Sequence, residues 1–124
     1  MYEINTCTND KQVDISYADI ITSTLINLGF RSISNKGFFY YKTAILLALY
    51  LPEDNIVLNE IYNTISLKYN KPAKKIKKNI NNLFERLNTT LLKENFHKTF
   101  NLEFDYSYVS PKNLLILILN LIKI

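Results

Sequence analysis

The spacing of hydrophobic and polar positions along the chain predicts a series of helices. Residues 16–28 begin with Ser16, which is followed three positions later by Asp19, a spacing that resembles a capped helix start. Apolar side chains then recur at helical intervals, and Gly29 provides the stop. We therefore expect a first helix over residues 16–28.

The most apolar stretch covers residues 38–50 and ends before Pro52. A helix that is apolar on nearly every face belongs in the centre of a domain. It begins with four consecutive aromatic residues, Phe38 to Tyr41, which could in principle stack on nucleic-acid bases. On a helix these four rings point in four directions, so core packing is the better interpretation.

Two amphipathic segments follow, joined by a short connector. In residues 56–69 the apolar positions have the i, i+3, i+4, i+7, i+11 spacing of one helix face: Leu58, Ile61, Tyr62, Ile65 and Tyr69. Residues 73–87 come directly after Pro72, which a helix tolerates best in its first turn. Their apolar stripe comprises Ala73, Ile76, Ile80, Leu83, Phe84 and Leu87. Two amphipathic helices joined by a turn of three or four residues form the helix-turn-helix pattern.

The helical signal is weak from residue 88 to residue 110. Aromatic and aliphatic residues alternate with mostly polar neighbours at Phe100, Leu102, Phe104, Tyr106 and Tyr108, which is strand-like. Pro111 then precedes a last helix over residues 112–124. The expected fold class is all-α, a domain of roughly six helices that contains a helix-turn-helix and can include a short extended segment at 100–108.

Positive charge is concentrated on one predicted helix. Five of the eight residues from Lys71 to Lys78 are lysine, and residues 71–86 have a net charge of +5, whereas the whole chain has +4. The polar side of the helix consists of Lys74, Lys75, Lys77, Lys78, Asn81, Asn82 and Glu85. Because the charge is confined rather than spread over the surface, nucleic acid is the first partner to consider.

Length and composition indicate one soluble domain. The chain has 124 residues, so we expect a single domain over residues 14–124. Residues 1–13 are polar and without periodicity and are expected to be a mobile tail. The one cysteine, Cys7, cannot form an internal disulfide, which fits a reducing cytoplasm. No signal peptide is visible, and the apolar run 114–124 is shorter than the roughly 20 residues that span a membrane.

The sequence offers little for catalysis. His97 is the only histidine and is interpreted as structural or exposed, and Cys7 has no base positioned to activate it. The acidic residues are scattered and there is no glycine-rich phosphate loop. We therefore expect neither an enzyme nor a bound cofactor or metal.

Several segments resemble one known family. Residues 28–30 (LGF), 36–45 (KGFFYYKTAI), 61–70 (IYNTISLKYN) and 110–114 (SPKNL) are similar in order and spacing to parts of the C-terminal DNA-binding effector domain of the stage 0 sporulation response regulator A family, the sporulation initiation factors of Firmicutes. The resemblance covers about residues 16–124.

The resemblance implies an all-helical domain that binds a short TGTCGAA-like box, in tandem or as a homodimer, and contacts RNA polymerase sigma factors. The family's DNA-contacting positions fall on Lys75, Lys77, Lys78, Asn81 and Asn82. The family has arginine at the first, third and fourth of these positions, an acidic residue at the second and histidine at the fifth. Lysine is a mobile point charge whereas arginine reads guanine with two hydrogen bonds. The changes imply retained DNA affinity with altered or relaxed sequence preference.

The resulting hypothesis is a stand-alone cytoplasmic, nucleoid-associated transcription regulator whose recognition helix, about residues 73–87, enters the major groove of double-stranded DNA. The expected DNA-binding residues are Lys71, Lys74, Lys75, Lys77, Lys78, Asn81 and Asn82. The family's phosphoacceptor receiver domain has no counterpart in the chain, so control is expected from expression level, partner binding or competition with full-length regulators.

Two alternatives stay open. The chain can be a protein-interaction module that does not bind DNA and pairs with, or antagonises, a related regulator or a sigma factor. The feature that indicates such a module is the very apolar segment 114–124, which could form an interface with another protein. Burial of this segment in the protein's own core is the better interpretation. RNA binding is the other alternative, and it is disfavoured because the aromatic residues are expected to be buried.

Overall fold

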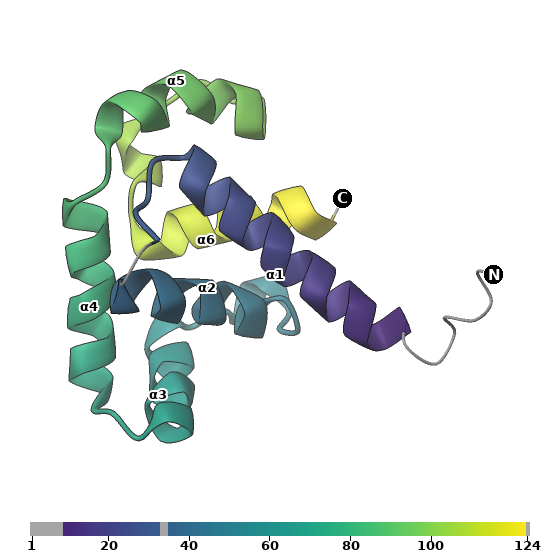
Figure 1. Ribbon diagram of the computed structural model, residues 1–124, viewed down its shortest axis with the longest axis vertical. Helices are drawn as coiled ribbons and strands as arrows, with labels where there is room; N and C mark the ends of the chain where they lie inside the picture. Colours follow the sequence, from purple (N-terminus) through teal and green to yellow (C-terminus); the bar gives the residue numbers. More distant parts are fainter. Residues whose placement is uncertain (1–8, 33–34, 124) are drawn as a thin grey trace.

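The described part of the chain is entirely helical. The computed structural model describes residues 9–32 and 35–123, and no strand occurs within these ranges (Figure 1). In chain order the elements are α1 (Asn9–Asn27), α2 (Lys36–Ala48), η2 (Glu53–Asn55), α3 (Leu58–Tyr69), α4 (Ala73–Glu85), α5 (Thr89–Phe100), η3 (Tyr106–Tyr108) and α6 (Pro111–Lys123), where η marks a 3-10 turn. The predicted all-α class, with about six helices, is confirmed.

Helix α2 lies at the centre of the packing. It contacts α1, α3, α4 and α6, and in Figure 1 α4 forms one edge of the molecule beside it. Of the four aromatic residues that begin α2, Phe38, Tyr40 and Tyr41 are buried, whereas Phe39 is 42% exposed. Core packing is therefore confirmed for three of the four rings.

Helix α6 is buried on one face and half-buried on much of the rest. Leu114, Leu115, Ile118 and Leu119 are inaccessible to solvent, and three further apolar residues pack against the core around them: Ile116, Leu117 and Ile122. The expected burial of this helix in the protein's own core is confirmed. None of the helices in the described ranges is long and apolar enough to cross a membrane.

The first helix begins earlier than predicted. Helix α1 starts at Asn9 and includes Ser16 in its interior, so residues 9–13, which were assigned to the tail, are helical. Residues 1–8, with Cys7, lie outside the described residues. No glycine or proline interrupts residues 9–15, and each residue added to an existing helix gains a hydrogen bond. The predicted stop is confirmed, because α1 ends at Asn27 and Gly29 has a φ of 100°.

The structure of residues 88–110 differs from the extended segment that was expected at 100–108. Helix α5 begins after Asn88, whose side chain accepts a hydrogen bond from the Leu91 backbone N–H at 3.1 Å. An irregular loop and η3 take the place of the extended segment at 100–108. Three aromatic rings surround Phe96 with centroid distances of 5.0 to 5.4 Å: Phe100, Phe104 and Tyr108. Three of the five alternating residues are therefore rings that converge on one buried side chain, whereas Leu102 and Tyr106 are exposed.

Candidate nucleic-acid interface

The packing of α4 separates an apolar inner face from a basic outer face. Ile76, Ile80 and Leu83 are buried, as the 3.6-residue helical period predicts. The cationic side chains of α4 are all exposed, as is Asn81: Lys74, Lys75, Lys77 and Lys78. Lys71, just before the helix, is exposed, and Asn82 is half-buried. The predicted division of α4 into an inner and an outer face is confirmed.

Phe84 helps to anchor α4 to the core. Its ring centroid lies 5.0 Å from that of Phe30, which follows α1, and 5.0 Å from that of Tyr41 in α2, both in edge-on geometry. Such pairs contribute about 0.5–1.5 kcal/mol beyond their buried area. The helix itself ends at Glu85, two residues before the predicted end, although Leu87 is still buried.

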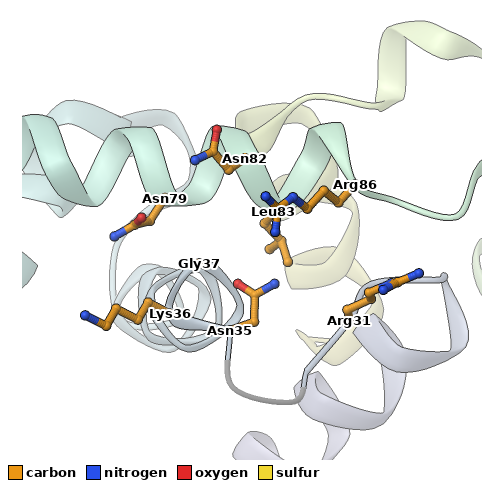
Figure 2. Close-up of a pocket in the computed structure, with 8 residues that line it drawn as sticks. All are labelled: Arg31, Asn35, Lys36, Gly37, Asn79, Asn82, Leu83 and Arg86. Atoms are coloured by element: carbon orange, nitrogen blue, oxygen red, sulfur yellow. The ribbon is translucent and has the colours of Figure 1, made fainter.

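A close approach at Gly37 fixes the position of α4 against α2. A Cβ atom on Gly37 would lie 2.2 Å from the Asn79 backbone oxygen, which is far inside van der Waals contact. Only glycine therefore permits this crossing, and the first turn of α2 lies directly beneath the middle of α4 (Figure 2).

The connector between α3 and α4 is held by local hydrogen bonds. Asn70 ends α3 in the left-handed conformation, with φ 53°, which asparagine tolerates better than most residues. The Lys71 backbone N–H donates to the Ser66 carbonyl at 3.1 Å, and the Ser66 hydroxyl donates to the Lys71 carbonyl. Lys71 is thus tied to the last turns of α3, immediately before the basic helix.

The charges of α4 are not neutralised within the described residues. No acidic side chain that the structure describes, within residues 17–32, 35–52 and 54–123, forms a salt bridge with the lysines of α4. The first turn of α4 has no acidic residue, and its N-cap, Pro72, makes no side-chain capping hydrogen bond. Because a helix N-terminus carries partial positive charge, the nearby cations Lys74 and Lys75 add to it. Both features favour an anion at this end of the helix.

Two open grooves flank α4. The Tyr62 groove, of about 400 Å³, lies on the α3 side and is lined by Asn59, Tyr62, Asn63, Ala73, Lys74 and Lys77. Burial raises the pKa of Tyr62 to about 12, so its hydroxyl is neutral and protonated at physiological pH. The side chains of the residues that line this groove include hydroxyl, amide and ammonium groups and no carboxylate.

The Arg31–Arg86 groove, of about 380 Å³, lies between α4, the first turn of α2 and the segment that follows α1. It is lined by Arg31, Asn35, Lys36, Gly37, Asn79, Asn82, Leu83 and Arg86. In Figure 2 the Arg86 side chain runs along the underside of α4, whereas the charged ends of Arg31, on the opposite rim, and of Lys36 point away from the groove. Three cationic side chains thus line this groove, again without a carboxylate.

The structure extends the predicted site. Every predicted residue lies on α4 or directly before it, and only Asn82 also lines the Arg31–Arg86 groove. Sequence reasoning did not assign Arg31, Lys36 or Arg86 to the site. One signal was available, since Arg31 and Arg86 are the only arginines of the chain.

Comparison with protein-family models, curated proteins and solved structures found no match. The resemblance to the sporulation effector domain therefore stays a prediction, and the functional argument rests on α4 and the two grooves.

Residues considered for catalysis contribute nothing further to this site. His97 lies on α5 and is exposed, in agreement with its interpretation as structural or exposed. Within residues 9–32 and 35–123, no cluster of histidine, cysteine, aspartate or glutamate has the geometry of a metal site.

Proposed function

We propose that the protein binds double-stranded DNA through the outer face of α4 and acts as a transcription regulator. The observation that supports this most strongly is the row of exposed, unpaired lysines on α4, a helix at the edge of the molecule whose inner face is fully engaged in the core. In this arrangement α3 and α4 form a helix-turn-helix and α4 is the recognition helix.

The dimensions of α4 suit the major groove. An α-helix with its side chains is about 10–12 Å wide, and the major groove of B-DNA is about 12 Å wide. The 13 residues of α4 extend about 20 Å at 1.5 Å per residue. With the inner face on α2 and α3, the outer face is free to enter the groove with the lysine-rich N-terminal half first.

The chemistry of α4 favours affinity over sequence reading. Lysine contacts to phosphate attract every DNA sequence alike. Asn81 and Asn82 are the side chains suited to base reading, because an asparagine amide pairs with adenine N6 and N7. Asn82 is half-buried, so Asn81 is the stronger candidate for a base contact. We infer a regulator with high salt-dependent affinity and modest sequence preference.

The salt dependence of binding tests this function. Lys75→Gln combined with Lys78→Gln removes two charges from α4 and keeps side chains that favour a helix. We expect the slope of log K against log salt concentration to fall by about one unit per lost phosphate contact. Fluorescence anisotropy with a random-sequence duplex at several salt concentrations measures this slope.

The matched control is Lys98→Gln combined with Lys123→Gln, which changes the net charge equally. These residues belong to the last turns of α5 and α6, whose C-terminal ends point away from α4 in Figure 1. Equal effects of the two double variants, or no DNA binding by the unmodified protein at low salt, would exclude α4 as the binding surface. A complex with a sigma factor or a related regulator in the absence of DNA binding would favour the protein-interaction alternative.

A further inference from the structure

Both arginines of the chain lie on the same groove. The sequence contains thirteen lysines and two arginines, and Arg31 and Arg86 both line the Arg31–Arg86 groove although they are far apart in sequence. Both are exposed, and neither of them pairs with a carboxylate whose side chain the structure describes. Arginine presents a planar fork of donors that matches a phosphate group, whereas lysine is a point charge.

Several other residues of the groove also carry hydrogen-bond donors. Lys36 supplies a third cation, and Gly37 belongs to the first turn of α2, where backbone N–H groups have no acceptor within the helix. Asn79 lines the groove as well, and its Nδ2 atom is buried and donates to no acceptor in the described part of the chain. The groove is therefore bordered by three cationic residues and by backbone and side-chain donors without acceptors, a composition that favours an anion.

The position of the groove relates it to DNA. It borders α4 on the side of Asn82, next to the exposed outer face. When a helix fills the major groove, the two sugar–phosphate backbones run along its sides. A backbone phosphate on that side would come close to Arg31, Lys36 and Arg86.

We infer that the Arg31–Arg86 groove binds a phosphate group, supplied by the DNA strand that runs beside α4. This inference rests on the proposed function for the source of the phosphate. Arg86 lies along the groove, and rotation of the exposed Arg31 side chain, which points away in Figure 2, brings its guanidinium to the phosphate oxygens from the opposite rim. Lys36 adds charge, so the contact positions α4 on the duplex without reading bases.

The test compares two double variants of the full chain with the unmodified protein on duplex DNA. In Arg31→Gln/Arg86→Gln the forks and the charges are both lost, and we expect affinity to fall at least about tenfold and the salt slope to decrease by about one. Arg31→Lys/Arg86→Lys keeps the charges but removes the planar guanidinium groups. We therefore expect the salt slope to stay unchanged and the affinity for DNA to fall by less than in the glutamine variant. Lys98→Gln/Lys123→Gln is again the charge control, and thermal unfolding of each variant checks that the fold is intact.

A second measurement separates the sources of phosphate. Inorganic phosphate is titrated into the isotope-labelled protein and the amide signals of Lys36 and Gly37 are followed by NMR. Loss of DNA affinity and slope in the arginine variants supports a backbone phosphate. Arginine-dependent shifts with inorganic phosphate, without any effect on DNA, support a free phosphate anion instead.

The outcomes keep the two proposals apart. In one outcome the Lys75/Lys78 variant loses affinity for DNA, the arginine variants bind DNA like the control, and inorganic phosphate shifts no amide signal. The groove is then not a phosphate site, and the proposed function stands. If the unmodified protein does not bind DNA but phosphate shifts the Gly37 signal through the arginines, the proposed function fails and the phosphate site stands. No DNA binding together with no phosphate shift overturns both.

Discussion

Helices α4 and α6 have the same length and opposite roles in the packing. Each has 13 residues. In α6 seven apolar side chains pack in or against the core, and only isolated positions such as Asn120 are exposed. In α4 the buried face is narrow, and the outer face carries four exposed lysines. The sequence of α6 is explained by folding alone, whereas half of α4 is not.

The outer face of α4 contains features that weaken a helix. Lys74 and Lys78 are like charges at i and i+4, an arrangement that destabilises a helix by about 0.2–0.5 kcal/mol. Cations in the first turn oppose the helix dipole. Residues that work against local stability and contribute nothing to the core are expected at functional sites. The difference between the two helices therefore supports the proposal that α6 serves folding and the outer face of α4 serves binding.

The largest expected effect comes from shortening a buried side chain of α6. Ile118 is fully buried, so Ile118→Ala should lower the free energy of unfolding by about 2–5 kcal/mol through lost burial and a residual cavity. Urea denaturation measures the change, with Asn120→Ala on the exposed side of α6 as the control, expected within about 0.5 kcal/mol. DNA affinity of the folded protein should not change. A tenfold loss of affinity in the folded variant would contradict the division of roles.

A smaller effect is expected where α4 meets α2. Gly37→Ala places a methyl group against the Asn79 carbonyl, so we expect a loss of about 1–3 kcal/mol in unfolding free energy together with weaker DNA binding, because α4 must shift. The adjacent exposed residue provides the control for the unfolding free energy alone, as Lys36→Ala, because Lys36 also lines the Arg31–Arg86 groove. Unfolding measurements on both variants and anisotropy measurements on Gly37→Ala check this. A Gly37→Ala protein as stable as the original would show that the crossing of α2 and α4 is looser than described.

The smallest effect concerns the buried tyrosine that joins α2 to α6. The Tyr41 hydroxyl donates to the Pro111 carbonyl at 2.8 Å, and Tyr41→Phe should cost about 1 kcal/mol. The pKa of Tyr41 lies well above its ordinary value, mainly because the side chain is buried and to a lesser extent because Tyr62 is close to it. Burial also raises the pKa of Tyr62 to about 12.

These pKa shifts predict the behaviour of the fold in alkali. The folded protein holds both phenolic protons more tightly than the unfolded chain, whose tyrosines ionise near pH 10. The stabilisation is therefore complete below pH 10 and is lost as pH rises from about 10 to 12. Urea midpoints at pH 8, 10 and 11 measure the loss, and Tyr41→Phe should make it shallower. An unchanged midpoint across this range would argue against the burial of both hydroxyls.

Periodicity alone predicted the helices that have long apolar stripes. The stripes of α3, α4 and α6 and the apolar run of α2 were sufficient, and so was the exposed position of the lysines on α4. Helix α5 was missed because only Leu92 and Phe96 are buried in it. The alternation of Phe104 with its neighbours pointed to a strand, but the ring packs on Phe96.

The chain's own sequence determined which side of α4 is basic, because a period of 3.6 residues places every apolar residue of the stripe on one face and the lysines on the other. Tertiary structure decided what lies beside that face. Arg31 and Arg86 are distant in sequence, and they share a groove only because Gly37 allows α2 to approach α4 closely. The face on which a residue lies in a helix depends only on its spacing from neighbours within a turn or two, so the lysine face could be predicted. The arginine groove depends on how α4, the first turn of α2 and the segment after α1 pack together, so it could not.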